Sequence, residues 1–220
     1  MGPGAGRAEV HVARIGLMGG TFDPVHYGHL VTAEEARVQF ELERVLFVPN
    51  RFPPHKSLNG VTDPEHRHHM TALAVAGNPR FAVSRLEIDR PGPSYTIDTI
   101  SELRREHEAR DLFYITGADA ILQIVRGEWE RSGELLTLCQ FIAASRPGFP
   151  IDAHDLRKYN VTGRLLDNLH VMEIPALAIS STDIRARVAA GRPIRYLLPD
   201  AVAAYIADHG LYRPPLRSLQ

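Results

Sequence analysis

The chain has 220 residues, of which 44% are hydrophobic and 23% charged, so it can bury a core of ordinary size. Its 25 basic and 26 acidic residues give a formal net charge of -1, which excludes the strong basic field that holds nucleic acid non-specifically. No apolar run approaches the roughly 18 residues of a membrane span, so we expect a cytoplasmic protein with no nucleic-acid or membrane partner.

Short apolar runs alternate with helical patterns along the chain. Residues 1–10 lack an apolar centre and are expected to be a flexible tail, followed by a single domain over 11–220. A strand, a helix and a strand are expected at 10–18, 30–40 and 45–49, in the β-α-β order of a parallel sheet. Further strands are expected at 81–84, 112–116, 141–145 and 170–174. The pattern predicts a Rossmann-like, doubly wound α/β fold.

Helix caps and helix-stop residues predict several helices outside the first β-α-β unit. Asp63 and Pro64 suit a helix start, and Gly191 suits a helix end. Helices are therefore expected at 63–76, from 93–96 onward, at 181–190 and at 199–210. The last two predict a small C-terminal helical cap from about residue 180. Cys139, the one cysteine, lies in an apolar run and is expected to be a buried thiol in a reducing compartment.

A glycine pair, a polar turn and two histidines stand where the first strand should meet a helix. The residues are Gly19-Gly20-Thr21-Phe22-Asp23-Pro24-Val25-His26-Tyr27-Gly28-His29. Glycines let backbone amides approach a phosphate closely, and a helix start directs free amides and a positive dipole end toward it. His26 and His29 can reach the same anion from one helix face. The combination predicts a phosphate site, although it is neither a dinucleotide fingerprint nor a Walker loop.

This run resembles the signature of the HxGH nucleotidyltransferases. A second run is similar to their other signature, in the expected order and separation: Ile179-Ser180-Ser181-Thr182-Asp183-Ile184-Arg185. Alone, the second run would be interpreted as an ordinary helix cap. Within the superfamily the chain is most similar to bacterial nicotinate mononucleotide adenylyltransferases, over nearly all of residues 15–212.

The resemblance implies transfer of the adenylyl group of ATP to nicotinate mononucleotide in NAD biosynthesis, which yields nicotinate adenine dinucleotide and pyrophosphate. A phosphate monoester has a second pKa of about 6, so the attacking oxygen is already ionised at neutral pH and needs no general base. The site must instead align two anions and stabilise the charge that develops. The residues implied to be catalytic are His26, His29, Lys56 and Arg185.

The resemblance also implies a set of ATP contacts: Gly19, Gly20, Thr21, Phe22, His29, Gly117, Asp119, Arg146, Ser180, Ser181, Thr182 and Arg185. Gly117 and Asp119 follow an expected strand, at the carboxyl edge where ligands of open α/β sheets bind. By residue type alone, Lys56 would be interpreted as a solvated loop lysine, and Arg146 could be either a surface arginine or a ligand contact.

The residues implied to bind the mononucleotide are Thr21, Lys56, Tyr95, Thr96 and Trp129. A helix start at Thr96 suits a pyridine carboxylate better than a neutral amide. The resemblance stacks Trp129 on the pyridine ring, although residue type alone does not decide between core and site. Glu130 stands where relatives often carry an aromatic residue. The change is harmless if this position contributes only a backbone amide to the carboxylate, whereas a glutamate side chain near the ring would repel nicotinate.

The expected cofactor is Mg²⁺, held by the phosphates of ATP and by water, with no metal site of the protein's own. His66, His68 and His69 lack the companion ligands of a zinc site. Alternatives are a nicotinamide mononucleotide or pantetheine-phosphate adenylyltransferase, or a non-catalytic nucleotide-binding regulator. The expected partners are ATP and nicotinate mononucleotide, and the sequence leaves open whether the chain forms a homo-oligomer.

Overall fold

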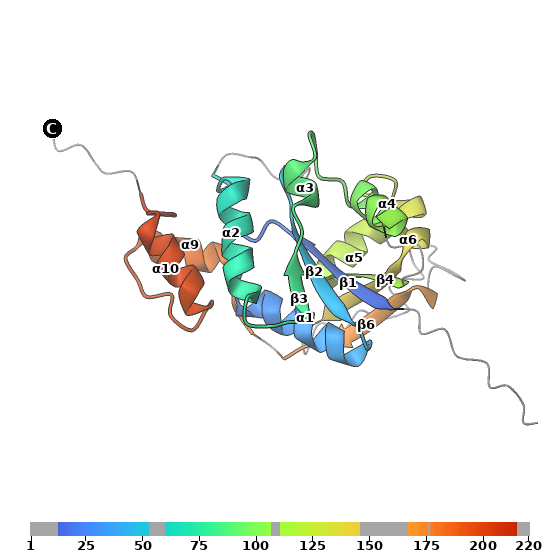
Figure 1. Ribbon diagram of the computed structural model, residues 1–220, viewed down its shortest axis with the longest axis horizontal. Helices are drawn as coiled ribbons and strands as arrows, with labels where there is room; N and C mark the ends of the chain where they lie inside the picture. Colours follow the sequence, from blue (N-terminus) through green and yellow to red (C-terminus); the bar gives the residue numbers. More distant parts are fainter. Residues whose placement is uncertain (1–12, 53–59, 107–110, 146–166, 176, 215–220) are drawn as a thin grey trace, which may run out of the picture.

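The computed structural model describes residues 13–52, 60–106, 111–145, 167–175 and 177–214. Within them the strands form a six-stranded parallel sheet of order β3-β2-β1-β4-β5-β6 (Figure 1). The strands are β1 (Arg14–Gly20), β2 (Arg44–Pro49), β3 (Phe81–Val83), β4 (Asp111–Gly117), β5 (Gln140–Ser145) and β6 (Leu169–Glu173). The strand order reverses between β1 and β4, where open α/β sheets bind ligands. The predicted fold class is confirmed.

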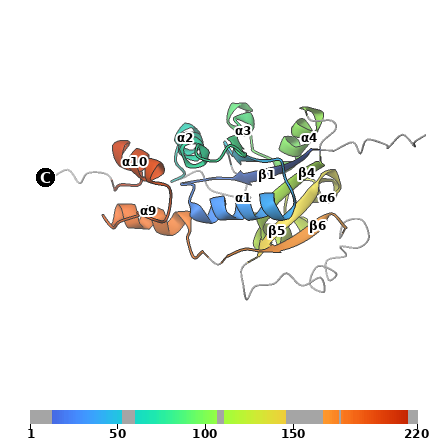
Figure 2. The same ribbon diagram turned by 60° about the horizontal axis from the view of Figure 1, so that its bottom comes forward.

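Helices cover the sheet on both sides (Figures 1 and 2). The core on one side includes residues of α1 (Tyr27–Gln39), α2 (Pro64–Val75), α9 (Ser181–Ala189) and α10 (Asp200–Asp208). The core on the other side includes residues of α4 (Thr96–Glu106), α5 (Ala118–Val125) and α6 (Ser132–Leu138). The short helix α3 (Leu86–Asp89) follows β3.

Alternation along the strands separates the two cores. In β1, Ile15 and Leu17 point to the side of α4 and α5, whereas Met18 points to the side of α1. In β4, Tyr114 and Ile115 divide in the same way. Successive side chains of a strand face opposite sides, and both sides of this sheet are covered, so the middle of β1 and of β4 is apolar on both sides.

The helical C-terminal segment packs beside α2 (Figure 1). On α10, the ring of Tyr205 stacks on that of His69 at 4.6 Å and on that of His209 at 3.9 Å, measured between ring centroids. Its hydroxyl lies 2.8 Å from Nδ1 of His66. The histidine run of α2 therefore docks α10. Within the described residues no helix is long and apolar enough to cross a membrane.

Some element boundaries differ from the predictions for identifiable reasons. Helix α1 begins at Tyr27, three residues before the expected start, because the first histidine of the motif caps it. Helices α3, α5 and α6 were not predicted. Gly117 before α5 and Arg131 before α6 give no side-chain cap, so the sequence carries no start signal. Cys139 is buried as predicted, and burial raises the pKa of its thiol to about 12. The tail at 1–10 lies outside the described residues, and the single domain stays a prediction.

Candidate active site

Two cavities open at the carboxyl ends of β1 and β4. One of about 670 Å³ is lined by His26 and His29, and we call it the histidine cavity. The other, of about 430 Å³, is lined by Trp129, and we call it the tryptophan cavity. Both volumes are typical of small-molecule sites. The cavities share three lining residues and therefore adjoin: Gly19, Thr21 and Thr116.

Gly19 and Gly20 are the last two residues of β1, and the turn follows them. A Cβ on Gly19 would lie 2.8 Å from the hydroxyl oxygen of Tyr114, and one on Gly20 would lie 2.9 Å from the ring of Phe22. In this structure glycine is needed because side chains crowd the strand end. The predicted reason, the close approach of a phosphate, stays a prediction. Within the turn after β1, the residue with a left-handed backbone conformation is Phe22, whose φ is 48°.

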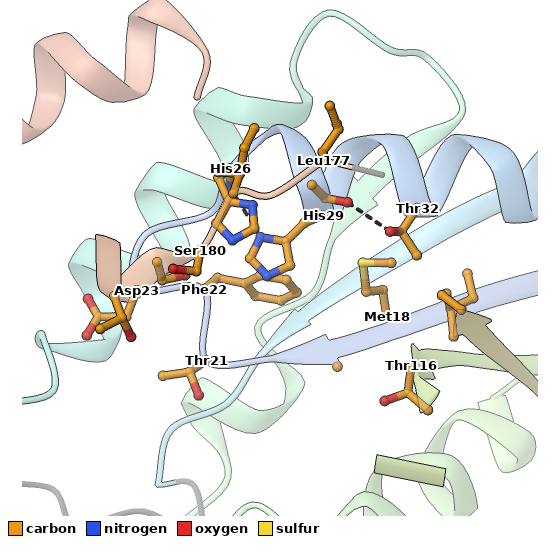
Figure 3. A pocket seen from close by; sticks show the side chains of 18 of the residues that line it. Met18, Thr21, Phe22, Asp23, His26, His29, Thr32, Thr116, Leu177 and Ser180 are labelled. Atoms are coloured by element: carbon orange, nitrogen blue, oxygen red, sulfur yellow. Dashed lines mark hydrogen bonds between the residues drawn. The ribbon is translucent and has the colours of Figure 1, made fainter. Parts of the chain in front are cut away.

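The two histidines of the motif hold each other in place. Their ring centroids lie 3.8 Å apart with the planes 25° from parallel, and the ring of Phe22 packs edge-on against His29 at 5.1 Å (Figure 3). The backbone N–H of His26 donates to Nδ1 of His29 at 3.2 Å. Because an accepting ring nitrogen carries no proton, neutral His29 holds its proton on Nε2, as a donor.

The second motif is hydrogen bonded to the first. Ser180 caps α9 by accepting a backbone N–H of its first turn at 3.1 Å. The hydroxyl of Ser181 donates to the carbonyl of Pro24 at 2.9 Å, and Nη1 of Arg185 donates to the carbonyl of Asp23 at 2.7 Å. Both motifs therefore line one cavity, as the resemblance implied. The cap interpretation of the serine run holds for Ser180 at the same time.

A buried carboxylate lies inside the first motif. Asp23 is 5% exposed, lines the histidine cavity, and accepts from the hydroxyl of Tyr212 at 2.7 Å and from the N–H of Thr62 at 3.2 Å. Burial and the neighbouring Asp23 raise the pKa of Tyr212 far above its usual range, so this hydroxyl remains a donor. Sequence reasoning passed over Asp23, although an acid within an anion-binding turn was a signal that it needed a partner.

The tryptophan cavity contains the predicted pyridine residues. Tyr95, Thr96 and Trp129 all line it, and Thr96 is the first residue of α4. The indole N–H of Trp129 donates to Oε1 of Gln123 at 3.1 Å, and its ring meets Tyr114 edge-on at 6.4 Å. The glutamate that departs from the family pattern, Glu130, also lines this cavity.

Two buried polar residues, Glu87 and Ser94, form part of the wall of the tryptophan cavity. Glu87 is 6% exposed and accepts from the hydroxyl of Thr99 at 2.6 Å, and burial raises the pKa of its carboxyl. Ser94 does not cap α4. Its hydroxyl oxygen accepts from the N–H groups of Arg51 and Phe52, at 3.0 and 3.3 Å. Sequence reasoning missed Glu87, because nothing in its local pattern sets it apart from a surface glutamate.

The remaining predicted residues divide into three groups. Gly117 and Thr182 line the histidine cavity. Asp119 is exposed in the first turn of α5 and, among the described residues, belongs to neither cavity lining. Lys56 and Arg146 lie outside the described residues, so their assigned roles stay predictions.

The arrangement defines a class of enzyme. Hydrogen-bond donors at a strand-order reversal, with an aromatic cavity adjoining, suit phosphate transfer between two bound nucleotides. The profile of the cytidylyltransferase-like family matches residues 17–187, which is most of the chain. The class is therefore that of the cytidylyltransferase-like nucleotidyltransferases.

Comparison with individual proteins narrows the family assignment. A protein of Moorella thermoacetica named a probable nicotinate-nucleotide adenylyltransferase is 55% identical over 204 residues, covering 92% of this chain and 93% of its own. A protein of the same name from Acidothermus cellulolyticus is 52% identical over 206 residues, covering 91% and 95%. The chain belongs to the nicotinate-nucleotide adenylyltransferase family.

A solved structure agrees in fold. The nicotinic acid mononucleotide adenylyltransferase of Plasmodium falciparum, complexed with NaAD, superposes with a TM-score of 0.73 at 22% identity. The superposition covers 91% of this chain and 97% of that one. At this identity the likeness concerns the fold alone.

Proposed function

We propose that this chain joins ATP and nicotinate mononucleotide to give nicotinate adenine dinucleotide and pyrophosphate, with ATP in the histidine cavity and the mononucleotide in the tryptophan cavity. The observation that carries this assignment is the junction of the two cavities at Gly19, Thr21 and Thr116. Substrates bound on either side would bring their phosphates together there. The family membership supports the same reaction.

The chemistry is an in-line displacement at the α-phosphorus of ATP. A phosphate oxygen of the mononucleotide forms a bond to that phosphorus while the bond to the bridging oxygen of the β-phosphate breaks, and pyrophosphate leaves with the electron pair. The attacking phosphate is ionised above its second pKa of about 6, so no proton has to be removed. The rate enhancement then comes from alignment and from stabilising the transferred charge.

The donors of the histidine cavity suit that task. His29 presents its Nε2–H, with His26 stacked against it, to the transferring phosphate. Arg185 donates to the carbonyl of Asp23 and, at 3.4 Å, to the hydroxyl of Thr182, and a guanidinium has five N–H groups in all. Together with the hydroxyls of Ser181 and Thr182 they would bind the departing phosphates. Lys56 would neutralise the incoming phosphate.

The tryptophan cavity suits a pyridine ring that carries a carboxylate. Trp129 offers a flat aromatic surface, and the start of α4 at Thr96, beside Tyr95, offers a positive dipole end. On the other side, Gly117 would contact the adenosine part, since the carboxyl end of β4 borders the histidine cavity. The family resemblance assigns Asp119 and Arg146 to the same part.

Mg²⁺ would enter with ATP. Among the described residues no group of three or more His, Cys, Asp or Glu side chains is arranged to hold a metal, and Asp23 already accepts two hydrogen bonds. Phosphates and water would therefore supply most of its ligands, and the ion would stabilise charge on the departing pyrophosphate.

The test is pyrophosphate release from ATP and Mg²⁺, with nicotinate mononucleotide, nicotinamide mononucleotide or phosphopantetheine offered separately. We expect the nicotinate form to give the highest kcat/KM. Faster turnover of nicotinamide mononucleotide would make that nucleotide the preferred acceptor substrate. The carboxylate of Glu130 in the cavity would favour this neutral ring over nicotinate. Absence of turnover with either pyridine mononucleotide would contradict the proposed reaction.

A further inference from the structure

A fully buried arginine lies behind the two cavities. Arg67, on α2, has 0% of its surface exposed. Its Nε donates to the carbonyl of Thr62 at 2.8 Å, and its Nη1 donates to the carbonyl of Thr21 at 2.8 Å and to Oδ1 of Asn50 at 3.3 Å. Its Nη2 donates to the carbonyl of Arg51 at 3.2 Å. One guanidinium thus bonds four residues from three separate segments.

Those acceptors are the supports of both cavities. Thr21 lines both, and Asn50 lines the tryptophan cavity. Thr62 follows two residues of the histidine-cavity wall, Gly60 and Val61, and donates its N–H to the buried carboxylate of Asp23. The two walls therefore share one anchor, on which their spacing depends.

The bond to Arg51 extends the anchor to the pyridine residues. The N–H of Arg51 donates to the hydroxyl of Ser94, which directly precedes Tyr95 and Thr96. The N–H of Ser94 in turn donates to the carbonyl of Phe52 at 3.0 Å. A displacement of the segment at 50–52 would thus move the start of α4.

The chemistry of the site requires arginine. A planar guanidinium offers five donors in a fixed fork, whereas a lysine offers three from one atom and cannot reach acceptors spread over the same arc. An apolar side chain would leave buried carbonyl groups without a donor. Burial lowers the pKa of Arg67, and the neighbouring carboxylate of Asp23 opposes this change. Among the described residues Arg67 lines neither cavity, so it would act on the substrates through other residues.

We propose that Arg67 is a positioning residue that sets the distance between the two half-sites, so that the acceptor phosphate and the α-phosphate meet in line. This inference rests on the proposed function. Each half-site would still bind its own substrate without Arg67, because the residues that touch that substrate remain. The step that needs both substrates in register would be lost. A shift of about 1 Å between reacting groups can cost on the order of 100-fold in rate.

The experiment compares Arg67→Lys and Arg67→Met with the wild-type enzyme and with Arg85→Lys. Arg85 is a matched control, because it is an exposed arginine that bridges α2 to α3 through Glu65 and Asp89. Calorimetry gives the dissociation constant and stoichiometry of each substrate alone, and steady-state assays give kcat. We expect the Lys variant to lose on the order of 100-fold in kcat, with full binding stoichiometry and nearly unchanged dissociation constants. The control should match the wild type.

Three results would overturn the proposal. Full turnover by Arg67→Lys would show that charge alone suffices. If kcat fell by the same factor as the fraction of protein that still binds substrate, Arg67 would contribute only to folding. A loss confined to the KM of one substrate would place its effect in one half-site. Failure of the proposed function is distinguishable from all three, because it would appear as absent turnover in the wild-type enzyme.

Discussion

The histidine and tryptophan cavities adjoin but are built differently. The first is lined largely by two continuous motifs that bond to each other directly, through Arg185 and Ser181 to the backbone carbonyls at 23 and 24. The second is assembled from short pieces of several segments, in which the buried residues Glu87 and Ser94 themselves line the cavity and the buried Arg67 supports the lining from outside it. In the first cavity the groups that hold the wall also face the ligand. In the second, one main support, Arg67, lies outside the cavity lining.

This difference predicts how substitutions behave. Substitution of a residue that faces the ligand in the histidine cavity should alter the chemical step. Substitution of a residue outside the lining that bonds to it, such as Tyr212, should alter stability. A change in the tryptophan cavity should alter the binding of one substrate and leave the other almost unaffected.

The largest effect is expected for His29→Ala. Its Nε2–H is assigned to the transferring phosphate, and loss of one such donor typically costs on the order of 100-fold to 1,000-fold in kcat. ATP binding, measured by calorimetry without the mononucleotide, should change little. His209→Ala, at an exposed histidine, is the control. Equal losses in kcat and in ATP affinity would contradict a role specific to the transition state.

Tyr212→Phe tests how far the first cavity depends on the C-terminal segment. The variant removes the donor to the buried carboxylate of Asp23, so we expect the free energy of unfolding to fall by about 2 kcal/mol in urea titrations. Tyr196→Phe removes a hydroxyl from a tyrosine that is 80% exposed and should leave the stability unchanged. Equal stability of both variants would show that the Asp23 bond adds nothing.

Trp129→Ala should affect one substrate only. Loss of ring stacking should raise the KM for the mononucleotide by about tenfold, while the KM for ATP stays nearly constant. Trp129→Phe should retain much of the affinity. A rise in the KM for ATP, with the KM for the mononucleotide unchanged, would refute the assignment of this cavity to the pyridine ring.

The smallest effect concerns the pH dependence of stability at Glu87. Burial raises the pKa of this carboxyl in the folded state, so the folded protein binds its proton more tightly than the unfolded chain. The stability that this proton contributes is present below the usual pKa of 4.5 and is lost as pH rises through the raised value.

Thermal unfolding of the wild type and of Glu87→Gln across that range tests this sign. The wild type should lose stability relative to the variant with rising pH, because the amide of Gln stays neutral. The stability of Glu35→Gln, a variant at an exposed position of α1, should change with pH in the same way as that of the wild type. A wild type that gains stability over the variant with rising pH would mean that Glu87 is held as a favourable carboxylate.

The parallel sheet could be predicted because both sides of its inner strands are buried, which makes these strands largely apolar runs. Each strand from β2 to β6 lies within one or two residues of its expected range. The short helices α5 and α6 could not be predicted, because they begin without a side-chain cap and follow the preceding element closely. Tertiary packing stabilises them.

The site was predictable where neighbouring residues act together and less so where distant residues meet. His26, His29, Arg185, Thr96 and Trp129 were all expected in the site, and all line the two cavities. The supports Arg67 and Glu87 were missed, because their partners come from other segments. Arg67 did carry one signal. It stands three and four residues before the buried Met70 and Thr71, on the inner side of α2.

The most direct test of the two-cavity account is a crystal structure with nicotinate adenine dinucleotide bound. The account predicts the adenosine part in the histidine cavity, the pyridine ring against Trp129, and the bridging phosphates at the junction beside Thr21 and His29. A pyridine ring outside the tryptophan cavity, or both halves of the dinucleotide in a single cavity, would contradict it.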